Sequence, residues 1–141
     1  MENASPKLIV AKYSEYPGPR YCIQGEYSGE DFYHQTLNSY FADAYEKKVK
    51  LFVYLDGTAG YASSFLDEAF GNLVYDFSKK IVQTYIEIVS NQEPDWKSMI
   101  LNDVFDDWEN RRLTRKPPKK TAKHKSWYRL VDNTLKKEVW L

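Results

Sequence analysis

Apolar and polar positions along the chain follow two repeat patterns. Short apolar runs of the kind that form strands occupy Lys7–Tyr13, Tyr21–Ile23, Val49–Leu55 and Ile81–Val89. Elsewhere apolar residues recur every three or four positions, which predicts helices that begin at Ser28, Ser64 and Pro94. The run Val49–Leu55 is apolar at almost every position, as expected of a strand buried on both faces. The alternation predicts an α/β fold with a central mixed β-sheet, about three main helices and a basic C-terminal extension.

Two of the predicted helices begin at serines. Ser28 is followed three positions later by Asp31, so its hydroxyl can cap the helix while acids occupy the first turn. Ser64 and Asp67 have the same spacing in the second helix, which makes Ser64 the predicted N-cap. Ser63 then lies one residue outside this helix and is the more exposed of the two serines.

The chain divides by charge and composition into three parts. Residues 1–110 carry nine Lys and Arg against 18 Asp and Glu, and are predicted to form the α/β domain. Residues 111–126 contain Pro117, Pro118 and no acid, and are predicted to be an exposed basic linker. Residues 127–141 are apolar enough to dock, and both a hairpin and a short helix fit their pattern. Residues 111–141 carry 11 Lys and Arg against two Asp and Glu, so they either have a separate partner or fold back on the acidic body.

Composition and cysteine content limit the class of protein. With 141 residues, of which 16% are aromatic, the chain can bury a sizeable core. No apolar run approaches the roughly 20 residues that cross a membrane, and the first residues lack the pattern of a secretory signal. The single cysteine, Cys22, cannot form an internal disulfide. These features predict a cytoplasmic protein with no membrane partner.

Residue types that catalysis requires are sparse. One cysteine and two histidines, His34 and His124, do not supply a standard zinc set. Gly57 and Gly60 lack the spacing of a phosphate-binding loop, and there is no Gly-x-Ser-x-Gly nucleophile motif. A dyad of Cys22 and His34 is conceivable, although a cysteine in a predicted strand is more often a small core residue. We therefore expect no catalytic residue, no metal, no cofactor and no enzymatic activity.

The joint from Leu55 to Gly71 carries the candidate regulatory and interaction residues. It runs from the end of a predicted strand, across a loop of small residues, into a helix, and such joints are where open α/β sheets place their sites. The candidates are Asp56, Thr58, Tyr61, Ser63, Ser64, Asp67 and Glu68.

Two interpretations stay open for these side chains. The serines either only terminate the helix, or one of them accepts a phosphate whose charge would meet Asp67 and Glu68. The acids could support acid–base chemistry or hold a divalent metal. However, Asp67 lies at a predicted helix N-terminus with Glu68 beside it, where acids are stabilising in themselves, and for the group of Asp56, Asp67 and Glu68 we favour a structural role.

The basic segment is a candidate nucleic-acid-binding site. Its cations can contact phosphates, and an aromatic residue directly after them can stack on bases. The candidate residues are Arg111, Arg112, Arg115, Lys116, Lys119, Lys120, Lys123, Lys125 and Trp127. The alternative, which we favour, is a solvated linker or a strap across the acidic body.

The block L-D-G-T-A-G-Y-A-S-S-F-L-D-E-A-F-G at Leu55–Gly71 resembles the signature of a bacterial STAS-like family of unknown function. The segment Ser28-Gly29-Glu30-Asp31-Phe32 also matches that family, and the resemblance covers about residues 20–92. It implies the α/β fold of the STAS domains of anti-anti-sigma factors. Those domains bind a histidine-kinase-like ATPase, which phosphorylates a serine at the start of a helix; by position this is Ser63 or Ser64. Where their acceptor motif is usually Asp-Ser-Ser-Gly, this chain has Ala62-Ser63-Ser64-Phe65, so the fold carries over better than the switch.

The sequence therefore predicts a non-enzymatic STAS-like module that binds another protein through Gly57–Phe70. The candidate partner is a histidine-kinase-like ATPase, and phosphorylation would act at Ser63 or Ser64. One alternative is an accessory protein that binds nucleic acid through the basic tail. Another is a small phage or mobile-element inhibitor whose acidic body imitates nucleic acid.

Overall fold

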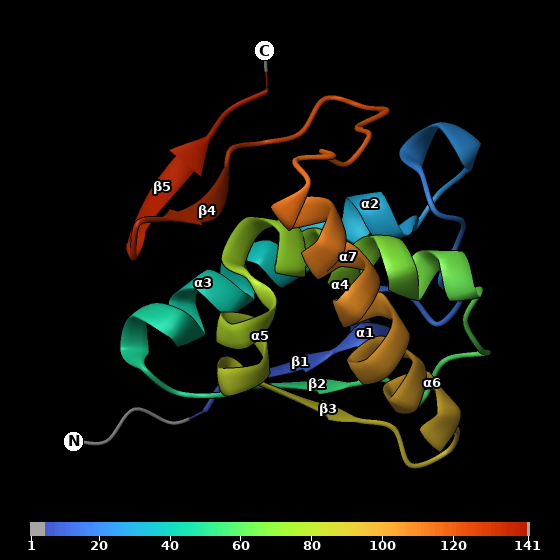
Figure 1. Cartoon of the computed structure of the whole chain (residues 1–141). Coiled ribbons are helices and arrows are strands. Elements are labelled where there is room, and N and C mark those ends of the chain that lie inside the picture. Colours follow the sequence, from blue (N-terminus) through green and yellow to red (C-terminus); the bar gives the residue numbers. More distant parts are fainter. Residues whose placement is uncertain (1–4, 141) are drawn as a thin grey trace.

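The computed structural model describes residues 5–140, and three short parallel strands form its sheet. The strands β1 (Lys7–Ile9), β2 (Leu51–Tyr54) and β3 (Ile86–Val89) lie in this order, with β2 in the middle. Leu8, Val53 and Ile88 are paired across the three strands and are buried. They face the core beneath four helices, which lie on one side of the sheet in Figure 1. These helices are α3 (Asn38–Lys47), α4 (Ser63–Phe77), α5 (Lys79–Tyr85) and α7 (Phe105–Leu113).

The other face of the sheet differs from the sequence prediction. Phe52 and Tyr54 alternate with the buried residues of β2 and are only half-buried. The prediction of a strand buried on both faces is therefore wrong, because the helices cover one face. The sheet is also parallel throughout rather than mixed, since Tyr21–Ile23 is not one of its strands in the described chain.

The predicted strand at Tyr21–Ile23 is instead a turn. Cys22–Gln24 form the 3-10 helix η1 within a loop that folds back on itself. The Gly18 N–H donates to the Tyr27 carbonyl, and the Gly29 N–H donates to the Pro19 carbonyl. A run of three apolar residues between Pro19 and Gly25 is too short to distinguish a turn from a strand.

Two other predicted strands are shorter than expected because a helix takes part of each run. The chain leaves β1 after Ile9 and forms the single turn α1 (Val10–Tyr13). Before β3, the helix α5 (Lys79–Tyr85) includes β-branched residues that sequence patterning assigned to the strand. Ser78 has a left-handed φ of 83° and its hydroxyl accepts the Ile81 N–H, so it starts α5 directly after the preceding helix ends.

The first long helix begins where the sequence predicted. The Ser28 hydroxyl accepts the Asp31 N–H at 3.0 Å, which confirms Ser28 as the N-cap. The helix then runs through α2 (Gly29–Phe32), a π-helical turn η2 (Tyr33–Leu37) and α3 (Asn38–Lys47).

The central helix is α4 (Ser63–Phe77), which buries 12 of its 15 residues and packs against α2 and α7. The last long helix comprises α6 (Pro94–Met99), the π-helical turn η3 (Ile100–Val104) and α7 (Phe105–Leu113). A Cβ at Gly71 would collide with the Trp108 indole, so this glycine allows α4 and α7 to approach closely.

The C-terminal segment is a hairpin, one of the two alternatives that the sequence left open. The strands β4 (Trp127–Val131) and β5 (Thr134–Glu138) are antiparallel and joined by Asp132 and Asn133, both with positive φ. The Asn38 side chain donates to the Tyr128 carbonyl and accepts the Tyr128 N–H, each at 2.8 Å. The hairpin therefore docks on the helical layer, as the red segment of Figure 1 shows. No described helix is long and apolar enough to cross a membrane.

Candidate functional site

The joint between β2 and α4 is held together by its own polar residues. The Asp56 carboxylate accepts the N–H groups of Asn91 and Gln92, at 2.9 and 2.8 Å, in the loop that follows β3. The Gly57 N–H donates in turn to the Gln92 side chain. Asp56 thus ties together the loops at the carboxyl ends of two neighbouring strands, which supports the structural role.

Thr58 and Tyr61 shape the same loop. The Thr58 hydroxyl accepts the Gly60 N–H at 3.2 Å, and the Tyr61 hydroxyl donates to the Leu55 carbonyl at 2.7 Å. Burial raises the pKa of Tyr61 to about 12, so the phenol stays protonated near neutral pH. Its ring lies against Trp96, and the loop and this ring border a small hollow of about 180 Å³.

The serines at the start of α4 behave differently from the sequence prediction. The helix begins at Ser63 and its N-cap is Ala62, whose backbone is extended. Ser64 is therefore not the N-cap, and Ser63 is not outside the helix. The Phe65 N–H already bonds to the Ala62 carbonyl, which starts the helix one residue earlier. Ser63 is exposed and Ser64 half-buried, and neither hydroxyl has a hydrogen bond within residues 5–140.

Asp67 and Glu68 are held by a residue that the sequence interpretation missed. The Arg20 guanidinium forms ion pairs with Asp67, at 2.5 Å, and with Glu68, at 3.3 Å. The Trp108 indole N–H also donates to Asp67. Glu68 is almost fully buried and accepts a hydrogen bond from Asn72; burial raises its pKa, against the effect of its hydrogen bonds from Asn72 and Arg20. These contacts give the two acids a structural role, but its basis differs from the prediction: because α4 begins at Ser63, its first turn contains no acid.

A shallow acidic hollow lies beside Ser63. Its walls include Arg20, Asp67, Asp103 and Asp107, and its volume is about 310 Å³. A phosphate on Ser63 would therefore be near three carboxylates and one guanidinium. The sequence predicted Asp67 and Glu68 as the acidic neighbours of this phosphate. In the structure Glu68 is buried, and the neighbours besides Asp67 are Asp103 of η3 and Asp107 of α7.

Most candidate nucleic-acid-binding residues contact their own chain. Arg112 forms an ion pair with Glu109, and the Arg111 guanidinium lies 3.9 Å from the centre of the Trp108 ring. Internal contacts also engage Lys119, over the Tyr21 ring; Lys120, over the Trp127 ring; and Lys125, on the Gln35 carbonyl. Trp127 is buried, whereas Arg115, Lys116 and Lys123 are exposed.

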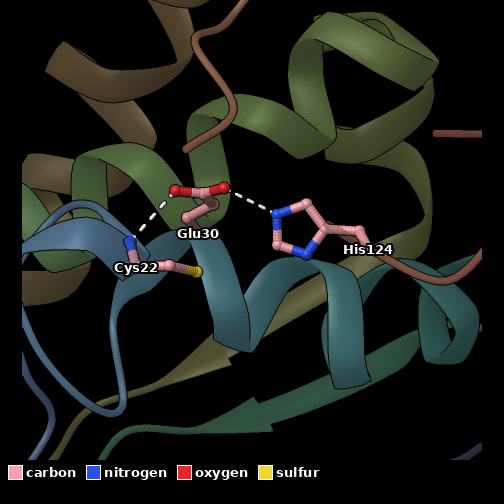
Figure 2. Close-up of side chains that lie close together, drawn as sticks. All are labelled: Cys22, Glu30 and His124. Atoms are coloured by element: carbon pink, nitrogen blue, oxygen red, sulfur yellow. Dashed lines mark hydrogen bonds and ion pairs between the residues drawn. The ribbon is translucent and has the colours of Figure 1, made fainter. Parts of the chain in front are cut away.

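The basic tail is fastened to the body at one buried carboxylate. Glu30, in the first turn of α2, has no exposed surface and accepts four hydrogen bonds. They come from the Cys22 N–H at 3.0 Å, the Thr121 hydroxyl at 2.6 Å, the Thr121 N–H at 2.8 Å and His124 Nε2 at 2.6 Å. Figure 2 shows the carboxylate between the Cys22 nitrogen and the His124 ring. Burial would raise the pKa of Glu30, but the hydrogen bonds from Thr121, His124 and Cys22 lower it to about 2.

A second histidine completes this group, which we call the Glu30 cluster: Cys22, Glu30, His34, Thr121 and His124. The His34 ring is stacked on the His124 ring with their centres 4.0 Å apart. Burial lowers the pKa of His34 to about 3, so its imidazole is neutral near pH 7. Both its ring nitrogens are buried and lack a hydrogen-bond partner among the described residues. The sequence contains a signal for two of the five members, Glu30 and His34, because these residues are four positions apart on one helix.

The comparisons with known proteins identify the domain. A family model described as "STAS-like domain of unknown function (DUF4325)" matches residues 28–96, from the N-cap of α2 to the start of α6. No curated protein and no solved structure gives a significant match. The match includes the joint between β2 and α4, the segment on which the resemblance rests. Residues 28–96, which are 69 of the 141 residues, are therefore similar to this STAS-like family of unknown function.

Proposed function

We propose that this protein is a non-enzymatic regulatory module that presents residues 57–64, the loop and first turn of α4, to another protein. The supporting observation is the difference between the serines and the other candidates at the joint. Asp56, Tyr61 and Asp67 are occupied by contacts within the chain. Ser63 is exposed and its hydroxyl makes no hydrogen bond within residues 5–140, so it is available to a partner.

The interaction surface is smaller than Gly57–Phe70. Phe65, Leu66 and Phe70 are fully buried in the core and cannot contact a partner without unfolding α4. Residues 57–63 are exposed or half-buried throughout, and they lie at the carboxyl end of β2. The first turn of α4 also lacks a side-chain cap, so N–H groups at its start can donate hydrogen bonds to a carboxylate or carbonyl oxygen of a partner.

Phosphorylation of Ser63 is the proposed regulation. A phosphoserine adds about −1.5 to −2 charges at neutral pH. At Ser63 this charge would lie beside Asp67, Asp103 and Asp107 with only Arg20 to balance it. Repulsion within this hollow, and toward any acidic partner group, would make the phosphorylated joint a poorer binding surface. The proposed partner is a cytoplasmic histidine-kinase-like ATPase, as the resemblance to STAS domains implies.

The test is phosphorylation by a histidine-kinase-like ATPase from the same genome. The chain is incubated with the kinase and ATP, and its intact mass is measured for wild type, Ser63→Ala and Ser64→Ala. We expect one added phosphate in wild type and Ser64→Ala and none in Ser63→Ala. Binding of the kinase to Ser63→Asp is expected to be weaker than binding to Ser63→Asn, the uncharged control of similar size. No mass gain in wild type, together with equal binding of these two variants, would reject the switch.

A further inference from the structure

We propose that Cys22, Glu30 and His124 form a zinc-binding site that joins the C-terminal tail to the STAS-like body. The three residues come from η1, from the first turn of α2 and from the tail, and are 8 and 94 positions apart along the chain. The thiol sulfur, a carboxylate oxygen and an imidazole nitrogen all lie within 4.8 Å of one another. Figure 2 shows that the Cys22 side chain points its sulfur toward the His124 ring.

The geometry requires only a small adjustment to bind a metal ion. With metal–ligand bonds of about 2.0 to 2.3 Å, the ligands of a tetrahedral zinc ion are about 3.5 Å apart. The Glu30–His124 hydrogen bond of 2.6 Å would open by less than about 1 Å, and the sulfur would approach by about the same distance. A hollow lined by Cys22, Ser28 and Asp31 lies beside the thiol and gives solvent and ions access from outside.

The hydrogen bonds around Glu30 would survive metal binding. Its Oε2 atom accepts one bond from the Thr121 N–H and one from His124, and a cation would take the place of the His124 proton. The bonds from Thr121 and the Cys22 N–H would remain and hold the carboxylate in position. The Ser28 hydroxyl donates to the Cys22 sulfur at 3.4 Å, a contact that also stabilises a thiolate. Such outer contacts orient the ligands of protein metal sites.

The charges in the site also favour a divalent cation. Glu30 and the Cys22 thiolate would together balance the two positive charges of zinc, with His124 neutral. Binding would release the thiol proton, and the proton on His124 Nε2 would move to Nδ1, so that the ring stays neutral and binds the cation through Nε2. A set of sulfur, nitrogen and oxygen ligands suits zinc and does not suit magnesium or calcium.

His34 is a second, independent observation that points to a ligand near this place. It is 2% exposed, stacks on His124, and both of its nitrogens are without a partner among residues 5–140. Buried polar atoms without hydrogen bonds are rare, and an ion or water usually explains them. His34 also lies in the π-helical turn η2, a type of distortion that occurs often at functional sites. The prediction of no metal site judged zinc from cysteine and histidine alone and considered carboxylate ligands only at Asp56, Asp67 and Glu68, whereas the fold brings Glu30 beside Cys22 and His124.

Cobalt(II) tests the proposal because its spectrum reports the ligands directly. The metal-depleted full chain is titrated with Co²⁺, and we expect one equivalent to bind with tetrahedral visible bands and a thiolate charge-transfer band. Zn²⁺ should then remove both signals. Cys22→Ser keeps the backbone N–H that bonds to Glu30, so the tail contacts remain while the sulfur is lost. We expect Cys22→Ser and His124→Gln to weaken binding at least about 100-fold, because even outer-contact losses weaken metal sites 10–100-fold.

The control variant is Glu26→Gln, which removes an exposed acid near the same loop and should bind Co²⁺ like wild type. Circular dichroism of each variant establishes that it is folded. Absence of the thiolate band in wild type, or its persistence in Cys22→Ser, would overturn the proposal. Binding of Co²⁺ without a thiolate band would also overturn it, since exposed carboxylates alone would then account for the metal.

Discussion

Two regions of the molecule, the β2–α4 joint and the Glu30 cluster, differ in how exposed their polar groups are. The joint is continuous in sequence, and its serine hydroxyls reach the surface without a hydrogen bond among the described residues. The cluster unites three distant segments, and its central carboxylate is fully buried with four hydrogen bonds. The joint is thus a continuous motif whose exposed serines form the interaction surface that we propose. The Glu30 cluster is discontinuous in sequence; it attaches the tail to the body and forms the metal site that we propose.

The largest expected effect of a substitution is at Glu30. Glu30→Ala would leave the buried His124 and the half-buried Thr121 without their shared acceptor, and each buried group that loses its partner costs about 1–3 kcal/mol, so the combined loss is the largest that we expect. Denaturant unfolding of the metal-free protein measures this loss of stability. The exposed control Glu26→Ala should change it by less than about 0.5 kcal/mol. Limited trypsin digestion should also cut Glu30→Ala faster at Lys119 and Lys123. Equal stability of the two variants would mean that the cluster does not hold the tail.

The sequence predicted single elements better than the contacts between them, because the signals for an element are local. The spacing of Ser28 and Asp31, the apolar run of β2 and the stripe of α4 each lie within one element and were correctly assigned. The Glu30 cluster depends on a contact between residues 94 positions apart, which no local pattern encodes. The error at Ser64 has a different origin: the capping spacing was present, but the chain started α4 one residue earlier, at Ser63.

Arg20 supplies the corresponding test of the joint. It balances Asp67 and Glu68, and Arg20→Gln would leave Glu68, which is 1% exposed, with only Asn72 to stabilise its charge. A buried polar group that loses one partner costs about 1–3 kcal/mol, so we expect about 2 kcal/mol, less than at Glu30. The control Lys97→Gln breaks the partly exposed ion pair with Glu87 and should cost less than about 1 kcal/mol. If Arg20→Gln costs no more than this control, Arg20 does not organise the start of α4.

Asp76 shows what happens to a buried carboxylate with fewer donors than Glu30. It accepts one hydrogen bond, from Tyr33, and burial raises its pKa to about 7. Because the pKa is raised in the folded state, the stability that Asp76 contributes is complete below its ordinary pKa of 3.8 and is lost as the pH rises through 7.

Unfolding measured between pH 5 and pH 8 should therefore show wild type becoming less stable as the pH rises. Asp76→Asn, which cannot ionise, is expected to flatten this part of the profile. The slope belongs to Asp76 only if this variant removes it, and a parallel profile in Asp76→Asn would assign it to other groups. The position lies beside Arg129 of β4, whose positive charge favours the ionised carboxylate and so reduces the slope that burial produces.

The smallest effects compare the two serines that the sequence treated as equivalent caps. The Ser28 hydroxyl is buried, accepts the Asp31 N–H and donates to the Cys22 sulfur, so Ser28→Ala should cost about 1 kcal/mol. Ser64 has no side-chain hydrogen bond within residues 5–140, and Ser64→Ala should change stability by less than about 0.5 kcal/mol. Chemical denaturation of the two variants with the same protocol resolves this difference. Equal losses would show that Ser64 caps α4 in solution, and Ser63 would then lie outside the helix, as its spacing in the sequence first indicated.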